Sequence, residues 1–221
     1  MSKILITICI SLLMVSTTYA GIIGNWENTS GDGWGGWISN NVVAANPLPI
    51  TLSNGVTYSQ STIGATLGSD SLDVTQSGWA QSLAISLNST QTADFMSHNT
   101  FSIDMTVAAA GPTITGGYSQ IYSVAMNAGG PGYTTVASGN PINFYWWAGS
   151  GQRTQTLNVD YTSFRNAMTE SSWCQIIITL NTGGGAPPDM YFDNARLTGV
   201  PEPATMALLG LGGLALIRRK R

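Results

Sequence analysis

Residues 100–107 read TFSIDMTV, and this segment indicates the fold more clearly than any other part of the chain. Four apolar side chains alternate with polar ones along it: Phe101, Ile103, Met105 and Val107 against Ser102, Asp104 and Thr106. Successive side chains of a strand point to opposite faces of a sheet. This period of two therefore predicts a strand with its apolar residues on one face and its polar residues on the other.

Similar segments recur on either side of residues 100–107, separated by turns rich in Gly and Ser. Three isoleucines at 176–178 predict burial on both faces, residues 161–168 predict a turn of helix, and GDGWGG at 31–36 predicts a tight loop. Further strands are expected at residues 55–60, 71–76, 80–87, 118–126, 142–148, 154–160, 173–181 and 191–198. Many short strands between turns predict an all-β, antiparallel sandwich whose two termini lie close together.

The order of short motifs resembles the jelly-roll, galactose-binding-like domains of carbohydrate-binding modules. The motifs, which cover residues 25–198, are NWENTSGDGW, SLDVTQSGW, TFSIDMTV and YFDNARLT. The resemblance implies a jelly-roll-like β-sandwich ectodomain. It also implies a structural calcium ion between the first and last strands, which assigns Glu27 and Asp193 as ligands, completed by further oxygens. The alternative is that Asp193 caps a turn or bulge and that Glu27 is exposed.

Consecutive aromatic residues at 145–147 are the candidate ligand contacts. Sugar rings stack on aromatic side chains, so Tyr145, Trp146 and Trp147 are assigned to ligand binding, with Trp146 or Trp147 as the best candidate for exposure. Because side chains alternate along a strand, at least one of the three rings faces away from the others. For most aromatic residues, including Tyr118, Tyr122 and Tyr133, we expect a place in the core.

The two ends of the chain have the composition of targeting segments. Residues 1–20 read as a secretory signal peptide, forming a helix: Lys3 is followed by an apolar run, and Thr18-Tyr19-Ala20 suits cleavage before Gly21. Residues 200–221 contain the triplet Pro201, Glu202, Pro203, an apolar helix over 204–217 and a cluster of four cations, Arg218, Arg219, Lys220 and Arg221. Residues 21–199 are then the part that folds, as one domain of ordinary size.

This three-part tail resembles the PEP-CTERM protein-sorting signal of Gram-negative bacteria. Its apolar segment is shorter than the roughly 20 residues of a comfortable membrane span, and the terminal cations stay on the cytoplasmic side. The resemblance implies that an exosortase-type enzyme recognises residues 201–203 at the inner membrane. We therefore expect export through the inner membrane to the cell surface, an outer layer or the extracellular matrix.

The charge of the folded part restricts the classes of partner it can bind, and its cysteine content indicates whether it has a reactive thiol. Only Arg153, Arg165 and Arg196 lie in residues 21–199, against ten acidic residues, which gives a net charge of −7. Nucleic acid is excluded, because phosphate binding needs clustered cations. Cys174 is left as the single cysteine, and its apolar surroundings predict a small buried side chain rather than a reactive thiol.

Catalytic groups are hard to assemble from this sequence, so we expect no enzyme. His98 is the single histidine; it lies in the polar stretch MSHNT, where we expect a solvated loop, and no G-x-S-x-G motif accompanies it. The favoured function is non-catalytic binding in the extracellular matrix or exopolysaccharide layer. A structural matrix protein without a defined ligand and a glycan-acting enzyme using two carboxylates remain the alternatives.

Overall fold

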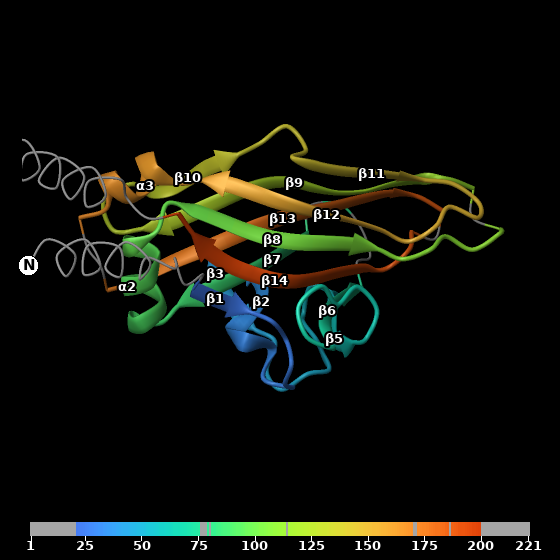
Figure 1. Cartoon of the computed structure of the whole chain (residues 1–221), viewed down its shortest axis with the longest axis horizontal. Coiled ribbons are helices and arrows are strands. Elements are labelled where there is room, and N and C mark those ends of the chain that lie inside the picture. Colours follow the sequence, from blue (N-terminus) through green and yellow to red (C-terminus); the bar gives the residue numbers. More distant parts are fainter. Residues whose placement is uncertain are drawn as a thin grey trace, which may run out of the picture.

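The computed structural model describes residues 21–75, 79, 81–113, 115–169, 172–185 and 187–199 (Figure 1). The predicted signal peptide and signal helix, the PEP triplet, the apolar helix and the basic cluster lie outside the described residues. Among the described helices, none is long and apolar enough to cross a membrane.

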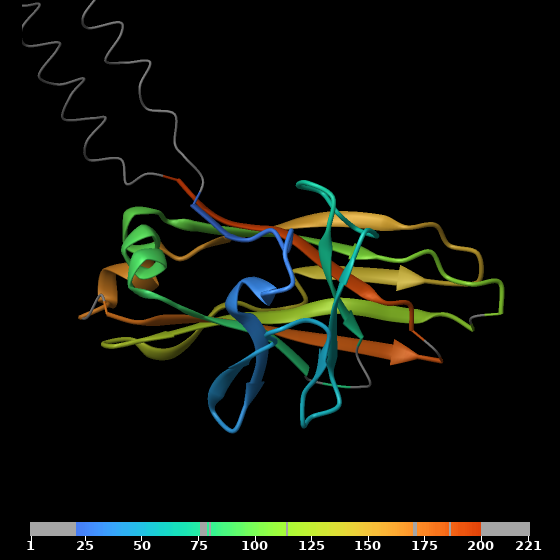
Figure 2. The ribbon, with the colours of Figure 1, turned by 90° about the horizontal axis from the view of Figure 1, so that it is seen from below.

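Two antiparallel sheets of seven strands form the domain, as predicted. Sheet A has the order β12-β8-β14-β6-β5-β4, with β1 beside β14. Its strands are β1 (Gly21–Gly24), β4 (Ile50–Thr51), β5 (Thr57–Ser61), β6 (Ser71–Thr75), β8 (Thr100–Val107), β12 (Arg153–Asp160) and β14 (Met190–Thr198). The first strand pairs with the last, so the two ends of the domain lie side by side, as expected (Figure 2).

Sheet B has the order β10-β9-β13-β7-β2-β3, with β11 beside β9. Its strands are β2 (Trp34–Ile38), β3 (Asn41–Ala44), β7 (Gln81–Leu87), β9 (Gly117–Ala128), β10 (Gly132–Ala137), β11 (Ile142–Trp146) and β13 (Cys174–Gly184). Gly31–Gly33, within the predicted loop, forms the short 3-10 helix η1 and leads directly into β2. Strands β1, β2, β3, β4 and β10 were not predicted.

The inner faces of the two sheets enclose one apolar core. Trp34 of β2 lies at its centre, 5.9 Å from the ring of Trp26 and 6.4 Å from that of Phe101 between ring centroids. Cys174 is also buried there, which confirms the prediction, and burial raises the pKa of its thiol to about 12.

Residues 100–107 form β8 with the predicted alternation, and the polar side of the strand is buried as well. Strands β12 and β14 flank β8 on both edges. On its outer side, the hydroxyl of Thr66 contacts Asp104, so a connecting segment covers the polar residues. A period of two tells which residues share a face, but not what covers that face.

Two α-helices lie at one end of the sandwich (Figures 1 and 2). Helix α3 (Thr162–Ala167) was predicted, whereas α2 (Ser89–Ser97) was not. The local signal for α2 is its capping box, in which Asn88 and Gln91 satisfy each other's backbone N–H groups. His98 ends α2 and is buried, with Nδ1 2.8 Å from the Asp94 carbonyl oxygen, so the expected solvated loop position is wrong.

Candidate functional site: the outer face of sheet B

The strands of sheet B contain no charged residue. None of β2, β3, β7, β9, β10, β11 and β13 includes Asp, Glu, Lys, Arg or His. All charged strand residues therefore belong to sheet A: Asp73, Asp104, Arg153, Asp160, Asp193 and Arg196. The outer face of sheet B is a neutral surface on a strongly acidic domain.

One part of this face is closed by an aromatic bridge, the ring pair of Trp37 and Tyr133, whose centroids are 6.3 Å apart. Trp37 belongs to β2 and Tyr133 to β10, and three strands lie between them in the sheet order. The rings therefore meet across the face. Ile177 lies on this face, between the inward-facing Ile176 and Ile178, and it is buried as expected beneath such a bridge. The prediction of burial on both faces of 176–178 is confirmed.

Polar groups beside the aromatic bridge are paired with one another. The amide of Asn127 donates to Gln175 Oε1 at 2.9 Å, and Gln175 Nε2 donates to the hydroxyl of Ser86 at 3.1 Å. A cavity of about 480 Å³ opens next to the bridge, lined by Trp37, Asn40, Asn127 and Tyr133. This part of the face is thus packed and internally satisfied, apart from that cavity.

The other part of the face carries exposed rings along β9. Tyr122 lies at a bulge in β9 between Ile121 and Ser123, and its side chain is 44% exposed. Its ring lies 5.7 Å from that of Trp79, which is 63% exposed. Tyr118 lies four residues before Tyr122 and pairs directly with Tyr145 of β11.

Between these two groups of rings runs a row of three amides, which we call the amide row: Asn143 of β11, Gln120 of β9 and Asn181 of β13. The strand register places Gln120 directly opposite both asparagines. The Oδ1 atoms of Asn143 and Asn181 are buried and have no hydrogen-bond partner among the described residues.

The structure separates the three candidate ligand residues at 145–147. Tyr145 and Trp147 are exposed, by 63% and 59%. Trp146 is 2% exposed and donates its Nε1–H to the hydroxyl of Ser119, so its assignment as a ligand contact is wrong. Trp146 alternates in phase with Ile142 and Phe144, which face the core. Trp147 lies beyond the end of β11, with the Arg153 guanidinium 5.5 Å from its ring centroid.

Asp193, a predicted calcium ligand, accepts hydrogen bonds from one segment of chain. Its carboxylate is fully buried and accepts from the backbone N–H groups of Thr66 at 2.5 Å, Leu67 at 2.6 Å and Asn194 at 2.6 Å. Burial raises the pKa of this carboxyl, and the hydrogen bonds counteract the rise. Asp193 thus fastens residues 66–67 onto the outer face of sheet A.

Glu27, the second predicted ligand, holds the next part of the same segment. Its carboxylate accepts hydrogen bonds from the backbone N–H groups of Ser69 at 2.8 Å and Asp70 at 3.0 Å. Both bonds lower the pKa of Glu27, and the bond from Asp70 has the larger effect. Gly68, which directly precedes Ser69, has φ +81°, and a Cβ there would lie 2.2 Å from the Glu27 carboxylate. Only glycine fits this turn.

The residues do not fit a calcium ion in this arrangement. Calcium takes six to eight oxygens, whereas the oxygens of Glu27 and Asp193 face N–H groups, whose positive ends point toward these carboxylates and would repel a cation bound there. Among the residues that the structure describes, no group of three or more His, Cys, Asp or Glu side chains is arranged to hold a metal.

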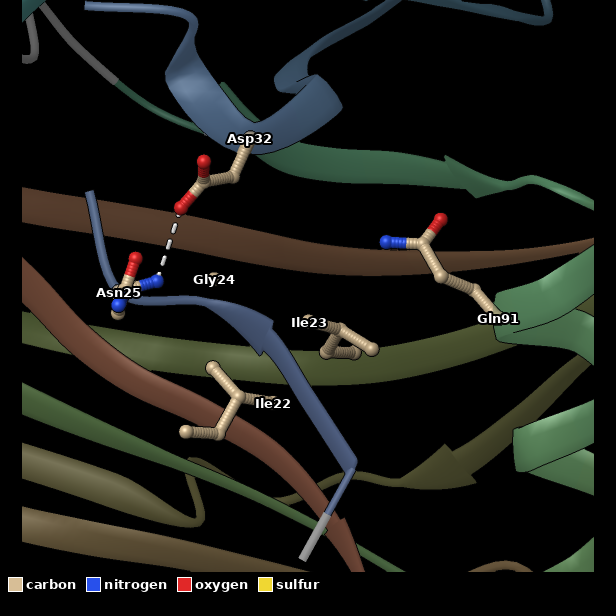
Figure 3. Close-up of a pocket in the computed structure, with 6 residues that line it drawn as sticks. All are labelled: Ile22, Ile23, Gly24, Asn25, Asp32 and Gln91. Carbon is tan, nitrogen blue, oxygen red and sulfur yellow. Dashed lines mark hydrogen bonds between the residues drawn. The ribbon is translucent and has the colours of Figure 1, made fainter. Parts of the chain in front are cut away.

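A second cavity, of about 370 Å³, lies beside β1 and is lined by Ile22, Ile23, Gly24, Asn25, Asp32 and Gln91 (Figure 3). Asp32 is its only charged lining residue among those described. Its Oδ2 accepts from the backbone N–H groups of Asn25 at 2.9 Å and Trp26 at 2.8 Å. These bonds hold a turn, so the carboxylate serves the fold there.

Several residues of the candidate site were expected in the core. Tyr122 and Tyr133 are exposed, so that expectation is wrong for both, and Trp37, Trp79 and the amide row were not singled out. The absence of charge from every segment that forms sheet B was the available signal. It becomes visible only when these segments are known to share one sheet.

Comparison with known proteins bears on both parts of the chain. Residues 199–221 match the family model of the PEP-CTERM protein-sorting motif, which confirms the predicted tail. The chain thus carries the sorting signal of an exported, surface-associated protein. No curated protein matches the sequence.

Solved carbohydrate-binding modules are similar in fold. The CBM22-1 xylan-binding domain of Paenibacillus barcinonensis Xyn10C is 14% identical, with 84% of this chain and 100% of that chain covered and a TM-score of 0.46. The non-crystalline-cellulose-specific module CBM28 is 13% identical, covering 81% and 94%, with a TM-score of 0.48. The family 11 module of Clostridium thermocellum Lic26A-Cel5E is 11% identical, covering 84% and 97%, with a TM-score of 0.41.

Proposed function

We propose that this protein is a non-catalytic binding protein of the extracellular matrix, which holds neutral polysaccharide on the outer face of sheet B. In this proposal it is exported through the inner membrane, and an exosortase-type enzyme processes it at residues 201–203. The protein then acts in the polysaccharide layer at the cell surface.

The observation that carries the proposal is the exposed ring pair of Trp79 and Tyr122 on a sheet without charged residues. Exposed aromatic rings offer flat apolar surfaces, and binding sites combine such surfaces with a few placed polar groups. A neutral sugar chain presents both apolar ring faces and hydroxyl groups. An anionic chain would meet the repulsion of a domain with net charge −7.

Affinity electrophoresis of the purified protein in gels containing neutral polysaccharides tests this function. Xylan, mixed-linked β-glucan and a polyuronate as the anionic comparison are suitable probes. We expect retardation by at least one neutral probe and at least a tenfold loss of affinity in Trp79→Ala, because a stacking ring is removed. Trp147→Ala is the matched control, because its ring is similarly exposed but lies beyond the end of β11.

The alternatives give different results in the same experiment. A structural matrix protein without a ligand shows no retardation in any gel. A glycan-acting enzyme releases products from the probes, and a single Asp or Glu substitution abolishes that release. Loss of binding in Trp147→Ala alone would place the site at the end of β11 and contradict the proposed face.

Processing is tested separately by intact-mass spectrometry of protein from the membrane and the medium of the native host. We expect a species beginning at Gly21 and ending near Pro201 outside the inner membrane. A species in the inner membrane that retains Arg221 would show a permanent anchor instead.

A further inference from the structure

The first residue of β1 lies against a carboxylate of α2. A Cβ added to Gly21 would lie 1.6 Å from the Oδ2 atom of Asp94. With ordinary bond lengths, this oxygen is within about 3.1 Å of the Gly21 Cα and within about 4.6 Å of the Gly21 nitrogen. Any residue with a side chain would displace Asp94, so this contact requires glycine at position 21.

Asp94 has no arginine or lysine partner among the residues that the structure describes. Its Oδ1 atom lies 3.4 Å from Nδ1 of His98, at the end of the same helix. Its Oδ2 atom, the one beside Gly21, accepts no hydrogen bond from a described residue. A carboxylate in this position stabilises a positive charge that comes within about 4–6 Å of it.

The cationic side chains of residues 21–199 are used elsewhere. This part of the chain contains no lysine and three arginines. Arg165 donates to the backbone oxygen of His98 at 2.7 Å. Arg196 donates to the backbone oxygen of Asn194 at 3.0 Å, and Arg153 begins β12. In a domain that starts at residue 21 and ends at residue 199, the α-amino group is therefore the only primary amine.

Building on the proposed export, we infer that Asp94 is the binding site of the α-ammonium group that cleavage before Gly21 creates. Hydrolysis of the Ala20–Gly21 peptide bond consumes one water molecule. Its oxygen goes to Ala20, which leaves with a carboxylate, and both hydrogens go to the Gly21 nitrogen, which becomes –NH₃⁺. Cleavage thus replaces a neutral amide beside Asp94 by a cation, and the new ion pair fastens β1 to α2.

The ion pair raises the pKa of the Gly21 amine above its ordinary value of about 7.7–8.0. A group whose pKa rises on folding stabilises the folded state below its unfolded pKa, and this contribution is lost as the pH rises through the folded pKa. The other charged groups around β1 are His98, Arg165, Arg196 of β14 and Asp32 of η1. Cleavage does not alter these groups.

Thermal unfolding of residues 21–199 with a free and with an acetylated N-terminus tests the inference. This part contains both sheets and the core that they enclose, and acetylation modifies only the N-terminus because lysine is absent. The acetyl group restores the neutral amide of the uncleaved chain. We expect the free-amine form to melt about 1–3 °C higher at pH 6, and the difference to vanish by pH 10.

Asp94→Asn is the decisive variant, because it keeps the shape of the side chain and removes its charge. Its free and acetylated forms should melt at the same temperature, which separates the ion pair from a general effect of terminal charge. Asp70→Asn is the matched control, because it removes a carboxylate from the segment that Glu27 holds and not from α2. It should keep the wild-type difference between the free and acetylated forms.

Equal melting temperatures of the two wild-type forms, or a difference that persists in Asp94→Asn, would overturn the inference. A mature protein from the native host that begins at a residue other than Gly21 would also overturn it, because the ammonium group would then lie elsewhere. A protein that shows the expected difference but is retarded by no polysaccharide would contradict the proposed binding function alone.

Discussion

The outer faces of the two sheets use polar residues in opposite ways. On sheet A, Asp104 and Asp193 sit on adjacent strands, and both accept hydrogen bonds from the segment that covers them. On sheet B no strand residue is charged, and the rings of Trp79 and Tyr122 remain exposed. Charged residues on sheet A therefore hold a covering segment in place, whereas sheet B leaves part of a neutral surface exposed.

Within sheet B, tryptophan rings are buried on the inner side and exposed on the outer side. Substitutions that compare the two sides should give the largest difference in stability. Trp146 is enclosed in the core and hydrogen-bonded to Ser119, so Trp146→Ala should reduce the free energy of unfolding by about 3–5 kcal/mol. Trp79→Ala and Trp147→Ala should stay within about 0.5 kcal/mol of wild type, because both rings are exposed. Urea denaturation measures all three. Equal losses would mean that the outer rings of sheet B are part of the packing.

The cover of sheet A is expected to depend on Asp193. Asp193→Asn keeps the shape of the side chain but replaces one carboxylate oxygen by an NH₂ group. Backbone N–H groups that donate to the carboxylate in the wild type would then face another donor. We expect a loss of about 2–3 kcal/mol in the free energy of unfolding, since buried donors are left unpaired. Protection from amide hydrogen exchange should fall at Thr66 and Leu67.

Glu27→Gln is the companion substitution for the exposed end of the same segment. It should change stability far less than Asp193→Asn, because water replaces the lost bonds of an exposed carboxylate. If the two substitutions are equally mild, the segment is held by something other than these carboxylates, and the contrast between the two outer faces loses its physical basis.

Much of this contrast could not be predicted from local patterns. The alternation in residues 100–107 correctly predicted β8 and its inner face, but the cover over Asp104 comes from Thr66, which is 38 positions away. The position of Trp146 was within reach, because it alternates in phase with Ile142 and Phe144. The amide row was not, because it depends on the register between strands that start at residues 117, 142 and 174.

Charge on sheet A is also expected to make stability depend on pH. Burial, with the nearby Asp189 charge as a second cause, raises the pKa of Asp73 from 3.8 to about 6. The folded protein then holds this proton more tightly than the unfolded chain does. Its contribution to stability is full below pH 4 and is lost as the pH rises through about 6.

Asp73→Asn removes this dependence. Above pH 6 the variant should be more stable than wild type by about 1 kcal/mol, a value reduced for the partial exposure of the side chain, and the difference should shrink toward pH 4. Glu27 and Asp160 have lowered pKa values and act in the opposite direction, but they are common to both proteins. Denaturation at pH 4, 5, 6 and 7 provides the comparison. A difference that does not vary with pH would show that Asp73 titrates normally.

The smallest expected effect concerns calcium. If N–H donors satisfy Glu27 and Asp193 as the structure shows, then adding EDTA or excess Ca²⁺ should leave the melting temperature unchanged. A rise with Ca²⁺ that Asp193→Asn abolishes would contradict this arrangement. It would mean that, when the ion is present, residues 66–70 turn carbonyl oxygens rather than N–H groups toward it, and that the two carboxylates bind it as well. The outer face of sheet A would then be fastened by a metal, yet its function as a cover, in contrast to the open face of sheet B, would be the same.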